Sequence, residues 1–224
     1  MPADRPVRPL PTRPLIEACV TSPSEVETAL AAGADRLELC RDLSTGGLTP
    51  GIDWLAETRA RTDKPLMVMI RPRPGTFQMT GAEIDQMLRS IVDLQAAGAD
   101  GFVLGVLDRA SRIDRVVLKE LVVAAGAPVT FHRAFDQVRD QVGALAGLVE
   151  AGVARVLTSG GPGTAWQGRK VLAELVAATE GQMTILAGGG VRAGHAPALV
   201  QQACLREIHA RASAIPDLVR AMPQ

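Results

Sequence analysis

Five ionisable side chains lie inside short, otherwise apolar segments of the chain, where a carboxylate or an imidazole is unusual. They are Glu17, Glu38, His132, Glu207 and His209. Burial can move the pKa of such groups toward neutral pH, which proton transfer to or from a substrate requires. We interpret these residues as candidate catalytic groups of a site that acts on a small anionic substrate, carboxylated or phosphorylated.

Cys19 and Cys40 form a second candidate site, for a metal ion. If they end adjacent parallel strands, which lie about 4.8 Å apart, we expect their sulfurs within about 4 to 6 Å of each other. A thiolate pair favours Cu(I), to which Met67 or Met69 could add a thioether. Zn²⁺ would instead require four ligands, with imidazole or carboxylate completing the set. Two buried cysteines that only pack are the alternative, and Cys204 we expect to be inert.

A third group of residues is typical of an anion site. Arg71 and Arg73 supply positive charge, and glycine-rich loops let backbone N–H groups approach an anion closely. The other candidate anion-binding residues are Ser159, Gly160, Gly161, Gly188, Gly189 and Gly190. Turns also require glycine, so the loops by themselves leave a purely structural role open.

An internal repeat indicates how these residues are positioned. Residues 31–35, 96–100 and 150–154 each combine a helix end with a glycine suited to the left-handed region, and each runs into a short β-rich segment. This unit, repeated along a chain, is typical of a parallel α/β fold.

The remaining pattern predicts eight strands separated by amphipathic segments. The predicted strands are residues 15–20, 35–40, 66–71, 101–107, 128–133, 154–159, 182–187 and 205–210, and clear helical segments are 24–32, 83–97, 113–125 and 138–151. Eight such units in about 200 residues predict a single (β/α)₈ TIM barrel over residues 15–224. An open, doubly wound sheet is the alternative.

Strand alternation then places the polar residues inside the barrel. Every second side chain points toward the axis, and in each strand the apolar set suits the helix layer, so the polar set faces inward. Barrel interiors are usually layers of Val, Ile and Leu, and a buried charge must pair or serve a ligand. We therefore expect Glu17, Glu38, Arg71, His132, Glu207 and His209 to line one cavity. The alternative is a self-satisfied core in which Glu38 pairs with Arg71, and Glu17 with Arg36.

The composition limits the kinds of partner and environment that we expect for this protein. Of the 224 residues 47% are apolar, enough for a sizeable core, while 24 basic and 24 acidic residues leave no net charge. Neutrality and only 3% aromatic residues argue against nucleic acid as a partner. No apolar run reaches the roughly 18 residues of a membrane span. Three cysteines argue against a disulfide framework and for the cytoplasm. Residues 1–14, rich in Pro and Arg, predict a disordered or extended arm.

Several motifs together carry a family resemblance. They are Glu17-Ala-Cys19, Glu38-Leu-Cys40, Gly46-Gly-Leu-Thr-Pro50, Ile70-Arg-Pro-Arg73, Gly105-Val-Leu107, Thr130-Phe-His-Arg-Ala-Phe-Asp136, Leu157-Thr-Ser-Gly160 and Glu207-Ile-His209. In this order, over residues 15 to 214, the chain resembles the CutC family of copper homeostasis proteins. The string from Thr130 to Asp136 is highly specific, and the glycine-rich pieces are less so.

The resemblance implies a cytosolic barrel that takes part in copper handling, forms dimers or higher oligomers, and binds Cu(I) through the cysteines that match Cys19 and Cys40. The chain departs from the family after His209, where most of the longer final loop is missing, and in its extra N-terminal arm. Two thiols suffice for Cu(I) and leave the inward acids and imidazoles without a role. Copper binding and a barrel enzyme therefore both remain open, while a pure scaffold would leave the inward charges unused.

Overall fold

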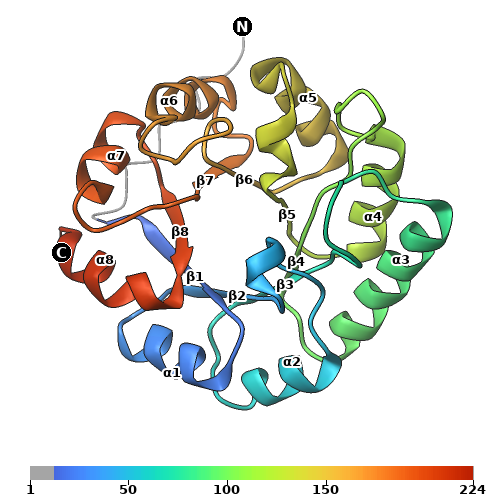
Figure 1. Ribbon diagram of the computed structural model, residues 1–224, viewed down its shortest axis with the longest axis horizontal. Coiled ribbons are helices and arrows are strands. Elements are labelled where there is room, and N and C mark those ends of the chain that lie inside the picture. Colours follow the sequence, from blue (N-terminus) through green and yellow to red (C-terminus); the bar gives the residue numbers. More distant parts are fainter. Residues whose placement is uncertain (1–12, 224) are drawn as a thin grey trace, which may run out of the picture.

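Eight parallel strands close into a barrel in the computed structural model, which describes residues 13–223. Each strand pairs with the next along the chain, and the first pairs with the last (Figure 1). The strands are β1 (Leu15–Val20), β2 (Arg36–Leu39), β3 (Leu66–Met69), β4 (Gly101–Leu104), β5 (Val129–Phe131), β6 (Arg155–Thr158), β7 (Thr184–Ala187) and β8 (Glu207–Arg211). The predicted (β/α)₈ barrel is confirmed, and closure excludes the open sheet.

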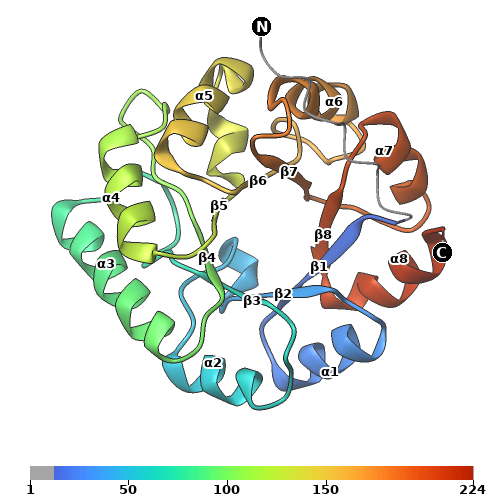
Figure 2. The same cartoon turned by 180° about the vertical axis from the view of Figure 1, so that it is seen from behind.

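The helices form a ring around the barrel, as both faces of the molecule show (Figures 1 and 2). They are α1 (Pro23–Ala31), α2 (Ile52–Arg59), α3 (Gly81–Ala96), α4 (Arg115–Ala125), α5 (Gln141–Ala151), α6 (Arg169–Ala178), α7 (Ala196–Gln202) and α8 (Ile215–Ala221), with short 3-10 turns η1 (Leu43–Thr45), η2 (Arg133–Gln137) and η3 (Ala212–Ala214). None of these helices is long and apolar enough to span a membrane, a finding limited to the described part of the chain.

Local signals set the helix boundaries as the sequence indicates. The glycine in each of the three repeats has a positive φ, 89° at Gly33, 101° at Gly98 and 90° at Gly152, which ends a helix without the strain that a side chain would bring. Ser22 caps α1 by accepting from the Glu25 N–H. Thr80 opens α3 with a full capping box.

Some boundaries differ from the prediction by a few residues. The His132 N–H still bonds to the Leu104 carbonyl at 2.8 Å, but the chain then turns into η2, so β5 ends before the predicted residue 133. The helix predicted from residue 138 begins at Gln141, because the Asp140 side chain accepts from the Gly143 N–H at 2.9 Å and caps it there.

The strands separate an apolar outer core from a polar interior. Outward side chains such as Leu37, Val68 and Ile208 are fully buried against the helices. Inside the barrel the apolar side chains form a smaller cluster, made of Cys19, Cys40, Met67, Met69 and Val103. The predicted alternation is confirmed: polar residues of the strands face the axis, and their apolar neighbours face the helices.

The barrel begins just before β1. Arg13 donates two hydrogen bonds to the Asp35 carboxylate, at 2.7 and 2.8 Å, and the same carboxylate accepts from the Ile16 N–H at 2.9 Å. Arg13 therefore belongs to the folded domain. Of the other residues of the predicted arm, Pro14 is buried, and residues 1–12 lie outside the described residues.

Candidate functional site

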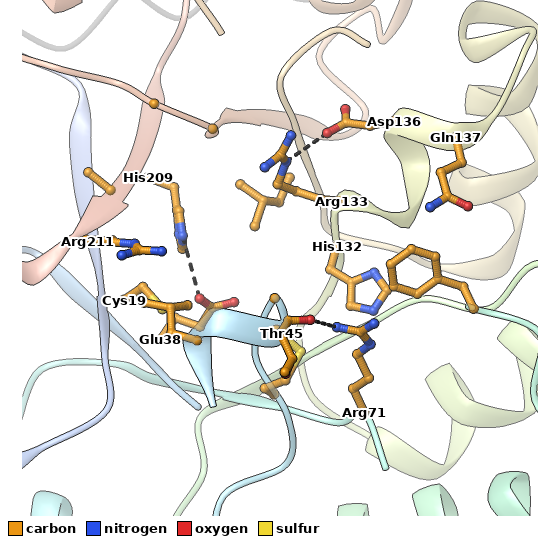
Figure 3. Close-up of a pocket in the computed structure, with 18 of the residues that line it drawn as sticks. Cys19, Glu38, Thr45, Arg71, His132, Arg133, Asp136, Gln137, His209 and Arg211 are labelled. Carbon is orange, nitrogen blue, oxygen red and sulfur yellow. Dashed lines mark hydrogen bonds and ion pairs between the residues drawn. The ribbon is translucent and has the colours of Figure 1, made fainter. Parts of the chain in front are cut away.

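A cavity of about 1000 Å³ lies at the C-terminal ends of the strands (Figure 3). It brings together residues that are far apart in the sequence, as the prediction expects of a barrel mouth. The predicted site residues that line it are Cys19, Glu38, Arg71, His132, Gly189, Gly190 and His209. The turn η1 contributes Leu43 and Thr45 to its wall.

Two thiols meet at the floor of the cavity. The sulfurs of Cys19 and Cys40 lie 3.4 Å apart, closer than the predicted separation, because Cys19 is the next-to-last residue of β1 and Cys40 directly follows the neighbouring strand β2. Both side chains are buried. The hydrogen bond with Cys40, burial and the nearby carboxylate of Glu38 raise the pKa of the Cys19 thiol well above its usual range. Without a metal ion, the Cys19 thiol is therefore protonated at neutral pH.

His209 lies between two carboxylates beside these thiols. Its Nδ1 is 2.8 Å from Glu17 Oε1, and its Nε2 is 3.6 Å from Glu38 Oε2. Burial lowers the pKa of His209, but the charges of Glu38 and Glu17 outweigh it, so the pKa is raised. Burial, with the charge of Glu17, raises the pKa of Glu38. The ligand atoms of Cys19, Glu38 and His209 lie within 4.8 Å of one another, a grouping that can hold a metal ion.

Glu17 and Glu207 do not line the cavity, contrary to the expectation that all six polar groups would do so. They lie nearer the N-terminal ends of β1 and β8, where Arg36 forms ion pairs with both carboxylates and Arg155 contacts Glu207 at 3.2 Å. Burial raises the pKa of Glu17, but Arg36 and His209 outweigh it and hold the pKa at about 2. The strand register explains the pairing, since Glu17 stands opposite Arg36.

The alternative, in which the inward charges pair with one another, is therefore correct for one of its two expected ion pairs. Glu17 pairs with Arg36 as that reading expects. Glu38 does not pair with Arg71, which donates instead to the carbonyls of Thr45 at 3.0 Å and Gly75 at 2.9 Å. The loops over the barrel mouth hold Arg71 away from Glu38, and the strand sequence contains no sign of that.

His132 lies beside Arg71 on the opposite wall from His209 (Figure 3). Burial and the charge of Arg71 lower the pKa of His132 to about 3, so the imidazole is neutral. The Ala134 N–H donates to Nδ1 at 3.3 Å, which leaves the ring proton on Nε2. This arrangement suits a hydrogen-bond donor rather than the general base that the sequence suggests.

The remaining predicted anion residues lie around the cavity rather than in its lining. Arg73 is engaged by the Glu83 carboxylate and by backbone carbonyls. Ser159 Oγ bonds to Asp136 Oδ2 at 2.9 Å and to the Gly161 carbonyl at 2.7 Å. Gly160 donates to Thr158, and Gly188 packs against Leu157 and His209.

The cavity also contains charged residues that sequence reasoning missed: Arg133, Asp136, Arg192 and Arg211. A signal was available for three of them. Arg211 occupies the alternate position after Glu207 and His209, so extension of the predicted strand by one residue would have placed it inward. Arg133 and Asp136 belong to the string from Thr130 to Asp136, the most specific motif of the chain. Arg192 follows the glycine-rich loop after β7 and carried no such signal.

Comparison with known proteins decides the family. The model of the CutC family matches residues 14–214. The chain belongs to the CutC family. It is 41% identical over 195 residues to a CutC family protein from Pasteurella multocida, a match that covers 87% of this chain and 80% of that protein. It is also 41% identical over 202 residues to a CutC family protein from Sinorhizobium medicae, covering 90% and 82%. The resemblance found in the sequence is thereby confirmed.

Solved structures agree with this assignment. A crystal structure from Streptococcus agalactiae, described as a candidate copper homeostasis protein CutC, is similar with a TM-score of 0.83 and 30% sequence identity, and the match covers 87% of this chain and 97% of that CutC chain. A deoxyribose phosphate aldolase from Aeropyrum pernix is similar with a TM-score of 0.67 and 15% identity, covering 92% and 88%. This second likeness shows the barrel fold alone.

Proposed function

We propose that this CutC family protein takes part in copper homeostasis and binds one Cu(I) ion through the thiols of Cys19 and Cys40. The observation that carries the proposal is the separation of 3.4 Å between the two sulfurs at the floor of an open cavity. Thiolates are soft ligands that select Cu(I). A related protein is described by its name as a candidate copper homeostasis protein, which supports the same cargo.

The geometry favours a bent coordination with a third ligand. With metal–sulfur bonds of about 2.3 Å, a linear S–Cu–S unit spans roughly 4.6 Å, while a three- or four-coordinate ion needs roughly 3.8 to 4.0 Å between sulfurs. The observed 3.4 Å is closer to the bent case. Met69 and Met67 lie in the same buried cluster as the thiols, and His209 and Glu38 lie on their cavity side.

Anaerobic titration with Cu(I) against a competing chelator such as bathocuproine disulfonate tests this function. We expect one ion per chain, and a loss of affinity of about 100-fold or more in Cys19→Ser and in Cys40→Ser. Cys204→Ser is the matched control, because that cysteine is exposed and far from the pair in sequence. Unchanged affinity in both pair variants, or a tighter Zn²⁺ site that depends on Glu38, would refute the proposal.

The alternative enzyme function has less support. Two of the five candidate catalytic residues, Glu17 and Glu207, are occupied by ion pairs below the cavity, and His132 is a neutral donor. Of the remaining groups, Glu38 and His209 lie against the thiols and suit a metal ion as well as a proton transfer.

The proposal includes a location and an assembly. Cu(I) and free thiols persist in a reducing compartment, so we place the protein in the cytoplasm.

We also propose that it forms a homo-oligomer. On α4, Val116 and Val123 are 80% and 67% exposed, and their spacing puts them on one face of the helix. Light scattering coupled to size exclusion tests the assembly, and a monomer at micromolar concentration would refute it.

A further inference from the structure

The arginine-lined half of the cavity is strongly cationic. Its arginines are at positions 71, 133, 192 and 211, of which Arg211 stands opposite Cys19 in the strand register, and among the described residues the carboxylates of the whole cavity lining are Asp136 and Glu38. The full chain has no net charge, so this concentration of arginine is a local feature. Guanidinium groups gathered at a concave mouth attract anions. Copper binding by two thiols uses none of them.

Two buried donors in this half have no acceptor. His132 is 4% exposed, and its Nε2, which carries the ring proton, has no hydrogen-bond partner among the described residues. Arg71 is also 4% exposed, and its Nε is equally unpartnered, while Phe77 packs against the guanidinium at 4.8 Å. The donors lie next to each other in Figure 3. A buried donor without an acceptor destabilises the folded protein, so two neighbouring ones indicate a place for an oxygen atom from a ligand.

The position of His132 depends on a neighbouring glycine. A Cβ at Gly105 would lie 2.4 Å from His132 Nδ1, so only glycine leaves room for the ring as it stands. The Ala134 N–H then fixes which nitrogen carries the proton. His132 is thus held in one orientation and one tautomer, as expected of a side chain that recognises a ligand oxygen.

A second set of donors lies at the rim near β7 and β8. Arg133 is braced by Asp136 at 2.8 Å and Ser159 at 3.1 Å, and it packs over Gly189, where a Cβ would lie 3.1 Å from the guanidinium carbon. Gly189 and Gly190 have φ values of 91° and 75°. Within the described residues, neither of their N–H groups donates a hydrogen bond, and no carboxylate pairs with Arg211.

We propose that this half of the cavity binds a small phosphomonoester that also carries a carbonyl or hydroxyl oxygen. The phosphate lies between Arg133, Arg211 and the free N–H groups of residues 189–190, and the second oxygen accepts from His132 beside Arg71. A phosphate dianion carries more negative charge and more acceptor oxygens than a carboxylate. It therefore suits a site made of two guanidinium groups and a loop of unpaired N–H groups better than a carboxylate does. The loops after strands 7 and 8 are also where barrels of this kind often bind phosphate.

Calorimetric titration of the metal-free protein tests the site, with thermal shift as a second measurement. The probes are orthophosphate, phosphoglycolate and ribose 5-phosphate at constant ionic strength, with glycolate and ribose as partners that lack the phosphate. We expect saturable binding of a phosphomonoester that exceeds orthophosphate, and no binding of the two partners. Failure of all three phosphate probes to bind or to stabilise the wild type would overturn the proposal.

Variants locate the ligand. Arg133→Met should weaken every phosphate probe by about 10-fold or more, since each lost charged hydrogen bond is worth at least that much. His132→Phe should weaken phosphoglycolate or ribose 5-phosphate by about 10-fold and leave orthophosphate unchanged. Arg220→Met, at an exposed position of α8, is the matched control and should bind as wild type does. Equal effects of the Arg133 and Arg220 variants would refute this location.

The double variant Cys19→Ser/Cys40→Ser separates this site from the copper site. It should lose Cu(I) and retain the phosphomonoester with unchanged affinity. Loss of the phosphomonoester in this variant, with the fold intact by circular dichroism, would show that the ligand requires the thiols and would overturn the proposed placement.

Discussion

Replacing Arg36 by methionine removes the cation that holds two carboxylates inside the barrel. Arg36 is 3% exposed and forms ion pairs with Glu17, which is fully buried, and with Glu207. In the variant Glu17 keeps only the hydrogen bond from His209, which it shares with Glu38. The methionine fills much of the same space, so the main change is an uncompensated charge rather than a cavity.

The expected cost follows from burial. Removing one partner of a buried pair destabilises by about 3–5 kcal/mol, because the remaining charge is left in a low-dielectric interior. With a urea m-value of about 2–3 kcal/mol per molar, the midpoint of unfolding should fall by about 1–2 M. The same substitution at Arg220, whose pair with Asp217 is 77% and 65% exposed, should cost less than about 1 kcal/mol.

The loss of stability in Arg36→Met should be larger at neutral pH than at acidic pH. In the wild type, the pKa of Glu17 is lowered from its ordinary 4.5 to about 2, so its stabilising contribution is present above pH 4.5 and is lost as the pH falls toward 2. In the variant, burial without Arg36 raises the pKa of Glu17 above 4.5, which destabilises the folded state at neutral pH. The difference between the two proteins should therefore be largest near pH 7 and shrink below pH 4.5.

Urea unfolding followed by circular dichroism at pH 7, 5 and 4 measures this difference. The double variant Glu17→Gln/Arg36→Met should regain part of the stability at pH 7, since the buried charge is gone. A difference between wild type and Arg36→Met that stays constant over this range, or a double variant less stable than the single one, would refute the electrostatic reasoning.

Two further predictions concern the cavity. The pKa of the Cys19 thiol is raised by its hydrogen bond with Cys40 and by burial, so Cu(I) must displace a proton when it binds. The affinity for Cu(I) should therefore rise about 10-fold per pH unit between pH 6.5 and 8 for each proton released. A Cu(I) affinity that does not change with pH in competition titrations would contradict this. Gly105→Ala should displace His132 and weaken phosphoglycolate binding about 10-fold with Cu(I) affinity unchanged, whereas Gly81→Ala, where a Cβ meets nothing within 4 Å, should change neither.

Much of this architecture follows from local rules that operate along the chain. The helix ends at Gly33, Gly98 and Gly152 depend on a backbone conformation that glycine adopts without strain, so the repeat is visible in the sequence. Alternation has a period of two in any strand, and it therefore predicted the inward set without knowledge of the barrel. The adjacency of Cys19 and Cys40 follows once β1 and β2 are parallel neighbours.

Depth within the barrel could not be predicted in the same way. Glu17 and His209 face the same axis, but His209 reaches the cavity while Glu17 lies below it. The difference arises from the stagger between strands, which depends on closure of the whole barrel. Closure of the barrel also decides which cation pairs with each carboxylate. It places Arg36, and not Arg71, next to Glu17 and Glu207.

The sequence by itself determined the fold class, the inward direction of the polar strand residues and the pairing of the two thiols, because each depends on backbone periodicity and on neighbouring strands. Only the tertiary structure decided the partners of those residues. The loops carry Arg71 to backbone carbonyls and bring Arg133 over Gly189, and the burial they create leaves His132 a neutral donor. Such long-range contacts depend on how loops from different strands pack at the mouth, and no short stretch of sequence records that.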